Sequence, residues 1–327
     1  MVTQQPSPAS ESTTTRVGAD PENLVCYFRG RFVPLGEAKI SIMTHAFLYG
    51  TAVFEGIRAY WNEDHQQLYV LRAREHIERI RSSAKVLFMD EGLPSVDEWV
   101  KLCVEVVRRN GFREDAYLRP SVYKSTEAIG VRLHALAHDF YIVSAPFGDY
   151  IDTHAGIRVK TSSWRRTADV AIPARGKIVG AYVNSALAKT DAMLDGYDEA
   201  IVLTWDGHAS EGSAENLFIV RDGVLLTPPV TDEILEGITR AGLIELAAEM
   251  GIPVVERSID RTELYVADEI LLCGTGAQVS SVVEVDHRKV GGGTPGPITT
   301  RLQARYFDIV RGNVPAYARW LVPVYER

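Results

Sequence analysis

The stretch IPARGKIVGAYVNSA, residues 172–186, places a lysine among small and apolar residues. Lys177 has Gly, Ala, Ile and Val around it, and the nearest carboxylate lies several residues away in the sequence. A lysine taken alone is more often a solvated surface charge than a nucleophile. Desolvation, however, lowers the pKa of an amine, and the neutral form can attack an aldehyde or ketone to form a Schiff base. The stretch therefore leaves two alternatives, an exposed loop or a nucleophilic site.

The composition of the chain is that of a globular protein without a strongly charged surface. Its 327 residues are 46% apolar and 24% charged, and the formal net charge is −8. Lys and Arg are scattered, which argues against nucleic acid or an anionic membrane as the main partner. No apolar stretch approaches the roughly 20 residues of a membrane span. The length predicts two domains.

The cysteines and the N-terminus bear on the compartment. Cys26, Cys103 and Cys273 are far apart and form no CxxC pair, so we expect neither a disulfide framework nor a metal site. Residues 1–23 lack the basic start and the apolar segment of a secretory signal. They are rich in Ser, Thr, Gln and Pro, and we predict a disordered tail there. These features favour a cytoplasmic protein.

Periodic segments and turn signals predict an α+β fold with two domains. Residues 95–110 read as a helix with a capping box of Ser95 and Glu98, and Gly111 ends it. Asp-Gly pairs at 206–207 and 222–223 predict turns between strands. We expect a smaller α+β domain, an interdomain loop and a larger α+β domain, with a cleft between the domains, at residues 24–147, 148–155 and 156–327.

Two carboxylates stand out in SEGSAENLF, residues 210–218. Glu211 and Glu215 lie beside small residues and run into an apolar strand. For an isolated pair, a polar hairpin with solvated acids is the better interpretation. A carboxylate at the edge of a strand could instead keep a heteroaromatic nitrogen protonated, so that the ring acts as an electron sink.

Two short stretches of the same half are candidate phosphate sites. In LEGITRAGLIEL, a helix begins near Ile238 and Thr239, and free backbone N–H groups at a helix N-terminus bind anions. On this stretch alone, Thr239 as an ordinary N-cap is the preferred interpretation. CGTGAQ, residues 273–278, is a turn of small residues that is able to bring backbone amides and Thr275 close to an anion, although a lone GTG is weak evidence and lacks the spacing of a dinucleotide-binding motif. Taken together, an amine, a carboxylate and two phosphate turns fit pyridoxal 5′-phosphate.

Longer motifs in the same order resemble one known family. HAFLYGTAVFEGIRAY, REHIERI, AYLRP, IPARGK, SEGSAENLF and LEGITR are similar to motifs of the class IV (fold-type IV) pyridoxal-phosphate aminotransferases, above all the branched-chain amino acid aminotransferases. The resemblance covers about residues 27–310. It implies a two-domain fold with the cofactor in the interdomain cleft, and transamination of Leu, Ile or Val with 2-oxoglutarate by a ping-pong mechanism.

The resemblance also implies a role for individual residues. Lys177 matches the Schiff-base lysine, Tyr182 the tyrosine at the phenolic oxygen of the cofactor, and Glu211 the partner of the pyridine nitrogen, with Glu215 ranked second. The phosphate ligands that it implies are Arg79, Ile238, Thr239 and Thr275. The substrate pocket that it implies comprises Tyr49, Phe54, Gly56, Tyr117, Arg119, Val131, Tyr150, Gly212, Thr275 and Ala277.

The resemblance further implies a homodimer, because in the family the segments bearing Tyr49 and Val131 reach into the site of the neighbouring subunit. Arg175, Ile178, Tyr123, Lys124 and Phe147 depart from the family pattern near the pocket, and the side-chain preference is open there. An (R)-amine or D-amino acid transaminase and an aminodeoxychorismate-lyase-like enzyme are alternatives on the same fold. A binding protein that has lost catalysis is an alternative of another class, although such a protein has no use for Lys177.

Overall fold

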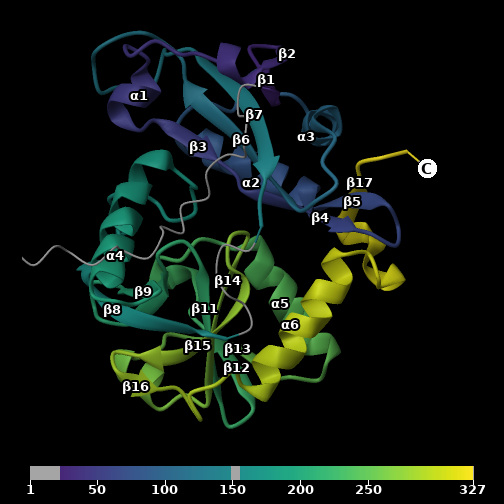
Figure 1. Ribbon diagram of the computed structural model, residues 1–327. Helices are drawn as coiled ribbons and strands as arrows, with labels where there is room; N and C mark the ends of the chain where they lie inside the picture. Colours follow the sequence, from purple (N-terminus) through teal and green to yellow (C-terminus); the bar gives the residue numbers. More distant parts are fainter. Residues whose placement is uncertain (1–22, 149–154, 327) are drawn as a thin grey trace, which may run out of the picture.

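The computed structural model describes residues 23–148 and 155–326. Nearly all of the expected tail, most of the expected interdomain loop and Tyr150 lie outside the described residues. Two β-sheets organise the described part, with helices packed against each (Figure 1). The α+β class predicted from the sequence is confirmed.

The first sheet has eight strands in the order β17-β5-β4-β6-β7-β1-β2, with β3 paired to β6. All of its pairings are antiparallel. Its strands are β1 (Val25–Phe28), β2 (Arg31–Pro34), β3 (Ala52–Phe54), β4 (Ile57–Asn62), β5 (Gln67–Leu71), β6 (Ala116–Lys124), β7 (His138–Pro146) and β17 (Leu321–Pro323). The helices in this part are α1 (His45–Tyr49), α2 (Ala73–Val86) and α3 (Val96–Asn110), with a 3₁₀ turn η2 (Leu35–Glu37).

The second sheet has nine strands in the order β10-β9-β8-β15-β14-β11-β12-β13, with β16 paired to β15. Because β10 also pairs with β11, the strands from β10 round to β11 close into a ring. Its strands are β8 (Ile157–Arg165), β9 (Glu199–Leu203), β10 (Ala209–Gly212), β11 (Asn216–Arg221), β12 (Val224–Thr227), β13 (Val254–Glu256), β14 (Glu269–Gly274), β15 (Gln278–Val285) and β16 (Arg288–Lys289).

Three longer helices accompany the second sheet, α4 along one side and α5 and α6 along the other (Figure 1). They are α4 (Tyr182–Leu194), α5 (Ile238–Glu249) and α6 (Pro297–Val310). This half of the chain also contains four short 3₁₀ segments, η3 (Val179–Ala181), η4 (Val230–Asp232), η5 (Arg261–Tyr265) and η6 (Pro315–Trp320).

Burial follows the sequence pattern. Helix α3 buries Trp99, Cys103, Val106 and Val107, the helical spacing of one apolar face, against the first sheet. Strands β9 and β11 of the second sheet are buried at almost every position, as their continuous apolar runs require. Burying such faces at about 25 cal/mol per Å² of apolar area is the main stabilisation of both layers.

Several local predictions are confirmed. Ser95 and Glu98 form the capping box of α3, and Gly111 ends the helix in the left-handed conformation. The Asp-Gly pairs at 206–207 and 222–223 lie in the β9–β10 and β11–β12 turns. One expectation is wrong: Thr239 is not the N-cap of α5. Gly237 is the N-cap, and Thr239 is the second helical residue.

The end of the chain crosses back to the first sheet. Strand β17 pairs with β5 through Leu321 and Leu71, next to the start of α2. The expected division into residues 24–147 and 156–327 does not include this return. None of the described helices is long and apolar enough to cross a membrane.

Candidate active site

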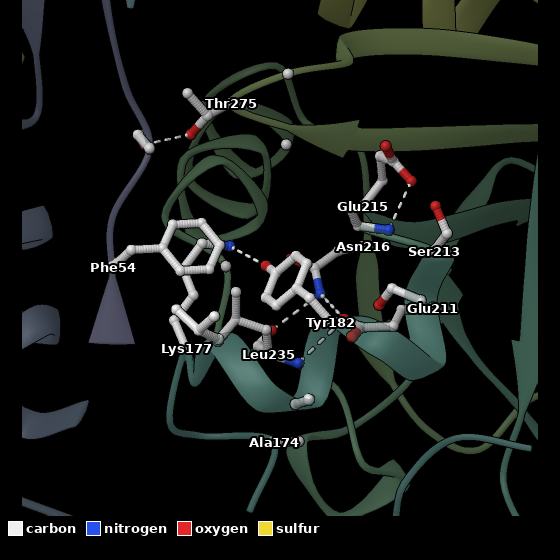
Figure 2. A pocket seen from close by; sticks show the side chains of 18 of the residues that line it. Phe54, Ala174, Lys177, Tyr182, Glu211, Ser213, Glu215, Asn216, Leu235 and Thr275 are labelled. Carbon is white, nitrogen blue, oxygen red and sulfur yellow. Dashed lines mark hydrogen bonds between the residues drawn. The ribbon is translucent and has the colours of Figure 1, made fainter. Parts of the chain in front are cut away.

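The candidate site is a cavity of about 740 Å³ lined by residues of both sheets. Its walls come from β3 and β6 of the first sheet, from the turn between β10 and β11, and from the start of α5. Figure 2 shows Phe54 of β3 and Glu211, Ser213 and Glu215 from the end of β10 and the turn that follows it. This volume suits a small-molecule site. Residues far apart in the sequence, such as Arg79, Lys177 and Thr275, meet here.

Lys177 lies in the loop between β8 and η3, which is fastened to the first sheet. Its backbone N–H donates to Ser83 Oγ at 3.1 Å, and its carbonyl oxygen accepts from the Phe54 N–H at 3.1 Å. The Nζ atom donates to Tyr182 Oη at 2.7 Å, and it lies 5.1 Å from the centroid of the Phe54 ring. Lys177 thus presents its amine inside the cavity, as Figure 2 shows.

Tyr182 begins α4, so its hydroxyl is held at a helix N-terminus beside the lysine. Its ring packs edge-on against Phe54, with the centroids 4.8 Å apart. A tyrosine hydroxyl that accepts from an amine at 2.7 Å can also contact a further polar group bonded near that amine. The pair predicted from the sequence therefore meets in the structure.

Glu211 is buried at the floor of the cavity and makes three contacts. Arg166 Nη2 lies 2.7 Å from Oε1. Oε2 accepts from Asn216 Nδ2 and from the Leu235 N–H, each at 3.0 Å (Figure 2). Burial raises the pKa of Glu211, and Arg166 acts against that rise. A buried carboxylate with these partners can accept one further N–H from a ligand that enters the cavity.

Glu215 also lines the cavity, at the other end of the turn that follows β10. Its Oε2 accepts from the Ala214 N–H at 3.0 Å. Burial raises the pKa of Glu215 to about 8, and the nearby Glu199 adds to the rise. Both acids of this turn are therefore buried, and the interpretation of solvated hairpin acids is wrong.

The predicted anion contacts gather at one end of the cavity. Ile238 and Thr239 open α5, whose first N–H groups have no partners within the helix. Arg79 reaches the same place from α2 and donates from Nη1 to the Glu236 carbonyl at 2.8 Å. Thr275 lines the cavity too, but its Oγ1 donates to the Gly56 carbonyl at 2.9 Å (Figure 2). The hydroxyl proton of Thr275 is thus already engaged.

A further part of the cavity lining consists of aromatic side chains and one arginine. Arg119 Nη2 donates to Tyr117 Oη at 2.9 Å, and its guanidinium lies 4.5 Å from the Phe54 ring centroid. Gly56 is required here, because a Cβ at this position would come 2.3 Å from Tyr117 Oη. Phe54, Gly56, Tyr117 and Arg119 therefore form one wall.

Other predicted pocket residues lie outside this wall. Among the described residues that line the cavity, Tyr49, Val131, Gly212 and Ala277 are absent. Tyr49 Oη accepts instead from the Gly130 N–H at 3.1 Å, next to Val131, which is 86% exposed. Ala277 is a buried residue of the β14–β15 turn, and Gly212 packs against Glu215.

Sequence reasoning missed Arg166, Asn216 and Glu55. Arg166 and Asn216 are the side chains that hold Glu211. Asn216 follows Glu215 directly in SEGSAENLF, and Arg166 lies in a loop of mixed residues, so neither has a periodic signal. Glu55 lies within FEGIR, and its burial between two strands could not be read from the sequence.

The cavity combines an amine, a buried carboxylate and free N–H groups for an anion, which is the set that a pyridoxal-phosphate enzyme needs. Comparison with known proteins gives the same class of enzyme. The model of the family Amino-transferase class IV matches residues 52–285. The chain belongs to the class IV aminotransferase family.

Similar proteins include several that are named as branched-chain aminotransferases. A protein of Aquifex aeolicus named "Probable branched-chain-amino-acid aminotransferase" is 51% identical over 92% of this chain and 97% of its own. The crystal structure of the T.th. branched-chain amino acid aminotransferase, complexed with N-(5′-phosphopyridoxyl)-L-glutamate, is similar with a TM-score of 0.89, 40% identity and coverage of 94% of this chain and 100% of that one. That of the branched-chain aminotransferase of Thermoproteus uzoniensis with norvaline has a TM-score of 0.87, 44% identity and coverage of 92% and 99%.

Proposed function

We propose that this protein is a pyridoxal 5′-phosphate-dependent aminotransferase that moves the amino group of Leu, Ile or Val to 2-oxoglutarate. The products are 2-oxo acids and L-glutamate. The observation that carries the proposal is the Lys177 Nζ at 2.7 Å from Tyr182 Oη, in a cavity whose floor is the buried Glu211. The relatives with this name and fold support it.

The residues of the cavity fit this cofactor. Lys177 would hold it through its aldehyde carbon, Tyr182 would contact its phenolic oxygen, and Glu211 would face its ring nitrogen. Its phosphate would lie at the end of the cavity formed by Arg79, Ile238, Thr239 and Thr275. When bound, the group supplies a carbonyl for bonding to amines and a ring that takes up electrons from the substrate. The N–H donors at the start of α5 match the phosphate of the cofactor, and the carboxylate of Glu211 matches its ring nitrogen.

Lys177 performs the proton movement. With a substrate in the cavity, the Nζ of Lys177 would take the proton from the substrate Cα and hold it for delivery to its acceptor. Tyr182 holds this nitrogen by its hydrogen bond. Glu211, fixed by Arg166 and Asn216, keeps the proton on the ring nitrogen. Two half-reactions at one lysine give ping-pong kinetics.

The wall of the cavity fits the proposed substrates. Phe54 and Tyr117 provide apolar area for a branched side chain, worth about 25 cal/mol per Å². Arg119 and the Tyr117 hydroxyl provide donors for a carboxylate, which the glutamate half-reaction requires. The T.th. relative has been crystallised with 4-methylvaleric acid, which has the carbon skeleton of leucine without its amino group.

We further propose a homodimer as the active form. Apolar side chains are exposed together on α1, the nearby segment at 129–131, and α4, which lie on one side of the molecule (Figure 1). Val179, Val183 and Leu187 follow the spacing of one helical face. The end of α1 lies next to η3, because the Gly180 N–H donates to the Gly50 carbonyl at 3.1 Å. Covering it with a second copy would bring Tyr49 and Val131 to the neighbouring cavity.

The division into domains and the location are also proposals. We place a smaller domain at 24–147 and a larger one at 156–327, with the last strand returning to the smaller one. A cytoplasmic location is supported by Cys26, Cys103 and Cys273, which are free and buried.

A panel of amine donors tests the proposed function. Purified protein with pyridoxal 5′-phosphate and 2-oxoglutarate is assayed with L-leucine, D-alanine and (R)-1-phenylethylamine, and glutamate formation is measured. We expect L-leucine to be the best donor. Preference for D-alanine would favour a D-amino acid transaminase, and preference for the aryl amine an (R)-amine transaminase.

A further inference from the structure

Glu55 is a buried acid that holds the arginine of the proposed phosphate end. It lies between β3 and β4, and its side chain is 0% exposed. Its Oε1 accepts from Arg79 Nε at 2.6 Å, and its Oε2 accepts from Arg79 Nη2 at 2.8 Å and from His76 Nδ1 at 2.7 Å. Three donors, two of them from one guanidinium, thus converge on a single carboxylate.

The charge states of this group follow from its surroundings. Burial alone would raise the pKa of Glu55, but Arg79 and then His76 outweigh burial and hold the pKa well below its ordinary range. Burial lowers the pKa of His76, although Glu55 acts against it. At neutral pH the group is therefore a carboxylate, a guanidinium and a neutral imidazole that donates from Nδ1.

Arg79 has N–H groups that its contacts with the described residues do not use. A guanidinium carries five N–H groups. In Arg79, the N–H of Nε and one N–H of Nη2 donate to Glu55, and one N–H of Nη1 donates to the Glu236 carbonyl. Among the described residues, one N–H on each terminal nitrogen remains for a ligand. Two adjacent N–H groups suit two oxygens of one phosphate.

We propose that Glu55 is a positioning residue, which fixes Arg79 so that these two N–H groups meet the phosphate of the cofactor. The inference rests on the proposed function, since it needs a phosphate-bearing ligand. Glu55 has two opposed effects on such a ligand. Its negative charge repels a phosphate, whereas its two bonds hold the Arg79 fork in one orientation.

Burial decides between these effects. The Arg79 side chain is only 13% exposed, so it cannot turn into water when its partner is lost. A guanidinium left without its buried counter-charge is strongly destabilised, and it would seek other acceptors. Orientation therefore outweighs repulsion, and removal of the Glu55 charge weakens phosphate binding.

The test compares two ligands that differ in the phosphate. Pyridoxal 5′-phosphate and 5′-deoxypyridoxal are titrated into the full chain, and binding is followed by the visible absorption of the lysine-bound form. In Glu55→Gln, we expect the affinity for pyridoxal 5′-phosphate to fall by about tenfold or more, the size of a lost charge-assisted contact. The affinity for 5′-deoxypyridoxal should change little, and inorganic phosphate should compete less well.

A second variant and a control complete the design. Glu55→Asp keeps the charge but shortens the side chain, so it should also reduce the preference for the phosphorylated ligand. If Glu55→Gln does not fold, Glu55→Asp alone tests the inference. Glu78→Gln is the control: Glu78 lies next to Arg79 on α2 but has an exposed side chain, so this variant should keep the wild-type preference.

Three results would overturn the inference. An unchanged or increased preference for pyridoxal 5′-phosphate in folded Glu55→Gln or Glu55→Asp would show that repulsion dominates or that Arg79 does not need Glu55. An equal loss for both ligands would show a merely structural role. A wild-type protein that forms no visible complex with either ligand would overturn the proposed function, and this inference with it.

Discussion

Glu211 and Glu215 lie at the two ends of one tight turn, but their carboxylates meet different surroundings. Glu211 contacts Arg166 and accepts from Asn216 and the Leu235 N–H. Glu215 accepts from the Ala214 N–H and lies near Glu199, which is itself paired with Lys189 at 2.6 Å. Arg166 opposes the effect of burial on the pKa of Glu211, whereas Glu199 adds to that effect at Glu215, so we assign the ring nitrogen to Glu211.

Glu211→Gln tests this assignment. The amide cannot hold the proton on the ring nitrogen, so we expect turnover with L-leucine to fall by roughly 10²-fold or more, the scale of a positioned proton-holding group. Cofactor binding should persist through the phosphate end. Turnover and the visible spectrum are measured together. Wild-type turnover in this variant would move the role to another residue.

Glu215→Gln tests whether the buried surroundings of Glu215 keep its carboxyl group protonated, and the quantity measured is the free energy of unfolding. An ordinary Glu ionises near 4.5, whereas Glu215 keeps its proton in the folded protein up to about pH 8. Its contribution to stability is therefore fully present below about pH 4.5 and is lost as the pH rises towards 8, by about 1.4 kcal/mol per pKa unit at most. Denaturant unfolding between about pH 5 and 8 measures this. The difference in stability between variant and wild type should grow with pH in favour of the variant, and a constant difference would contradict it.

At the scale of elements, the start of α5 links the two ends of the cavity. Gly237 caps the helix directly ahead of Ile238 and Thr239, and Asn216 contacts both Glu211 and the Leu235 carbonyl. A Cβ on Gly237 would come 1.8 Å from Asn216 Oδ1, although the φ of −71° suits any residue. This glycine is needed for close approach and not for its backbone conformation.

Gly237→Ala should therefore disturb both ends of the cavity, the Glu211 contacts and the start of α5. We expect a loss of about 1–3 kcal/mol in stability, as in overpacked sites, and weaker cofactor binding, because Asn216 must leave Glu211. Unfolding and cofactor titration measure the two effects. Gly292→Ala is the matched control, since a Cβ there meets only Thr294 Oγ1 at 3.8 Å. Equal behaviour of the two variants would contradict the role given to Gly237.

The elements were more predictable from the sequence than the contacts between them. The capping box of α3 and the Asp-Gly turns are local, so residue type and spacing suffice. The motifs also indicated Lys177, Tyr182 and Glu211, which meet in the cavity. Arg166 and Glu55 act through partners far away in the sequence, and β17 returns to a sheet formed mainly by the first half of the chain. Only the folded chain shows such pairings.

At the scale of the whole molecule, the exposed apolar patch is the feature that a single chain does not explain. Phe47 and Val183 are each 66% exposed, and Val131 is 86% exposed. Apolar residues grouped in this way mark an interaction surface. In the proposed homodimer, a second copy covers this face, and the segments that carry Tyr49 and Val131 reach the substrate wall of the neighbouring chain.

Phe47→Asp tests the dimer. A charge on this exposed side chain should leave the fold of one chain intact but oppose burial in an interface. We expect sedimentation to show a dimer for the wild type and a monomer for the variant, and turnover with L-leucine to fall with it. Trp205→Asp, a change at a 75% exposed side chain in the β9–β10 turn, is the control and should stay dimeric. A wild-type protein that sediments as a monomer would contradict the proposal.

The central claim is that the Lys177 amine carries the cofactor. Reduction of the yellow protein with borohydride, followed by proteolysis and mass spectrometry, tests this directly, because reduction makes the bond between amine and cofactor permanent. We predict a single phosphopyridoxyl group on the peptide that contains Lys177, and none in Lys177→Ala. A label on another lysine, or no label in a protein that catalyses transamination, would contradict the account.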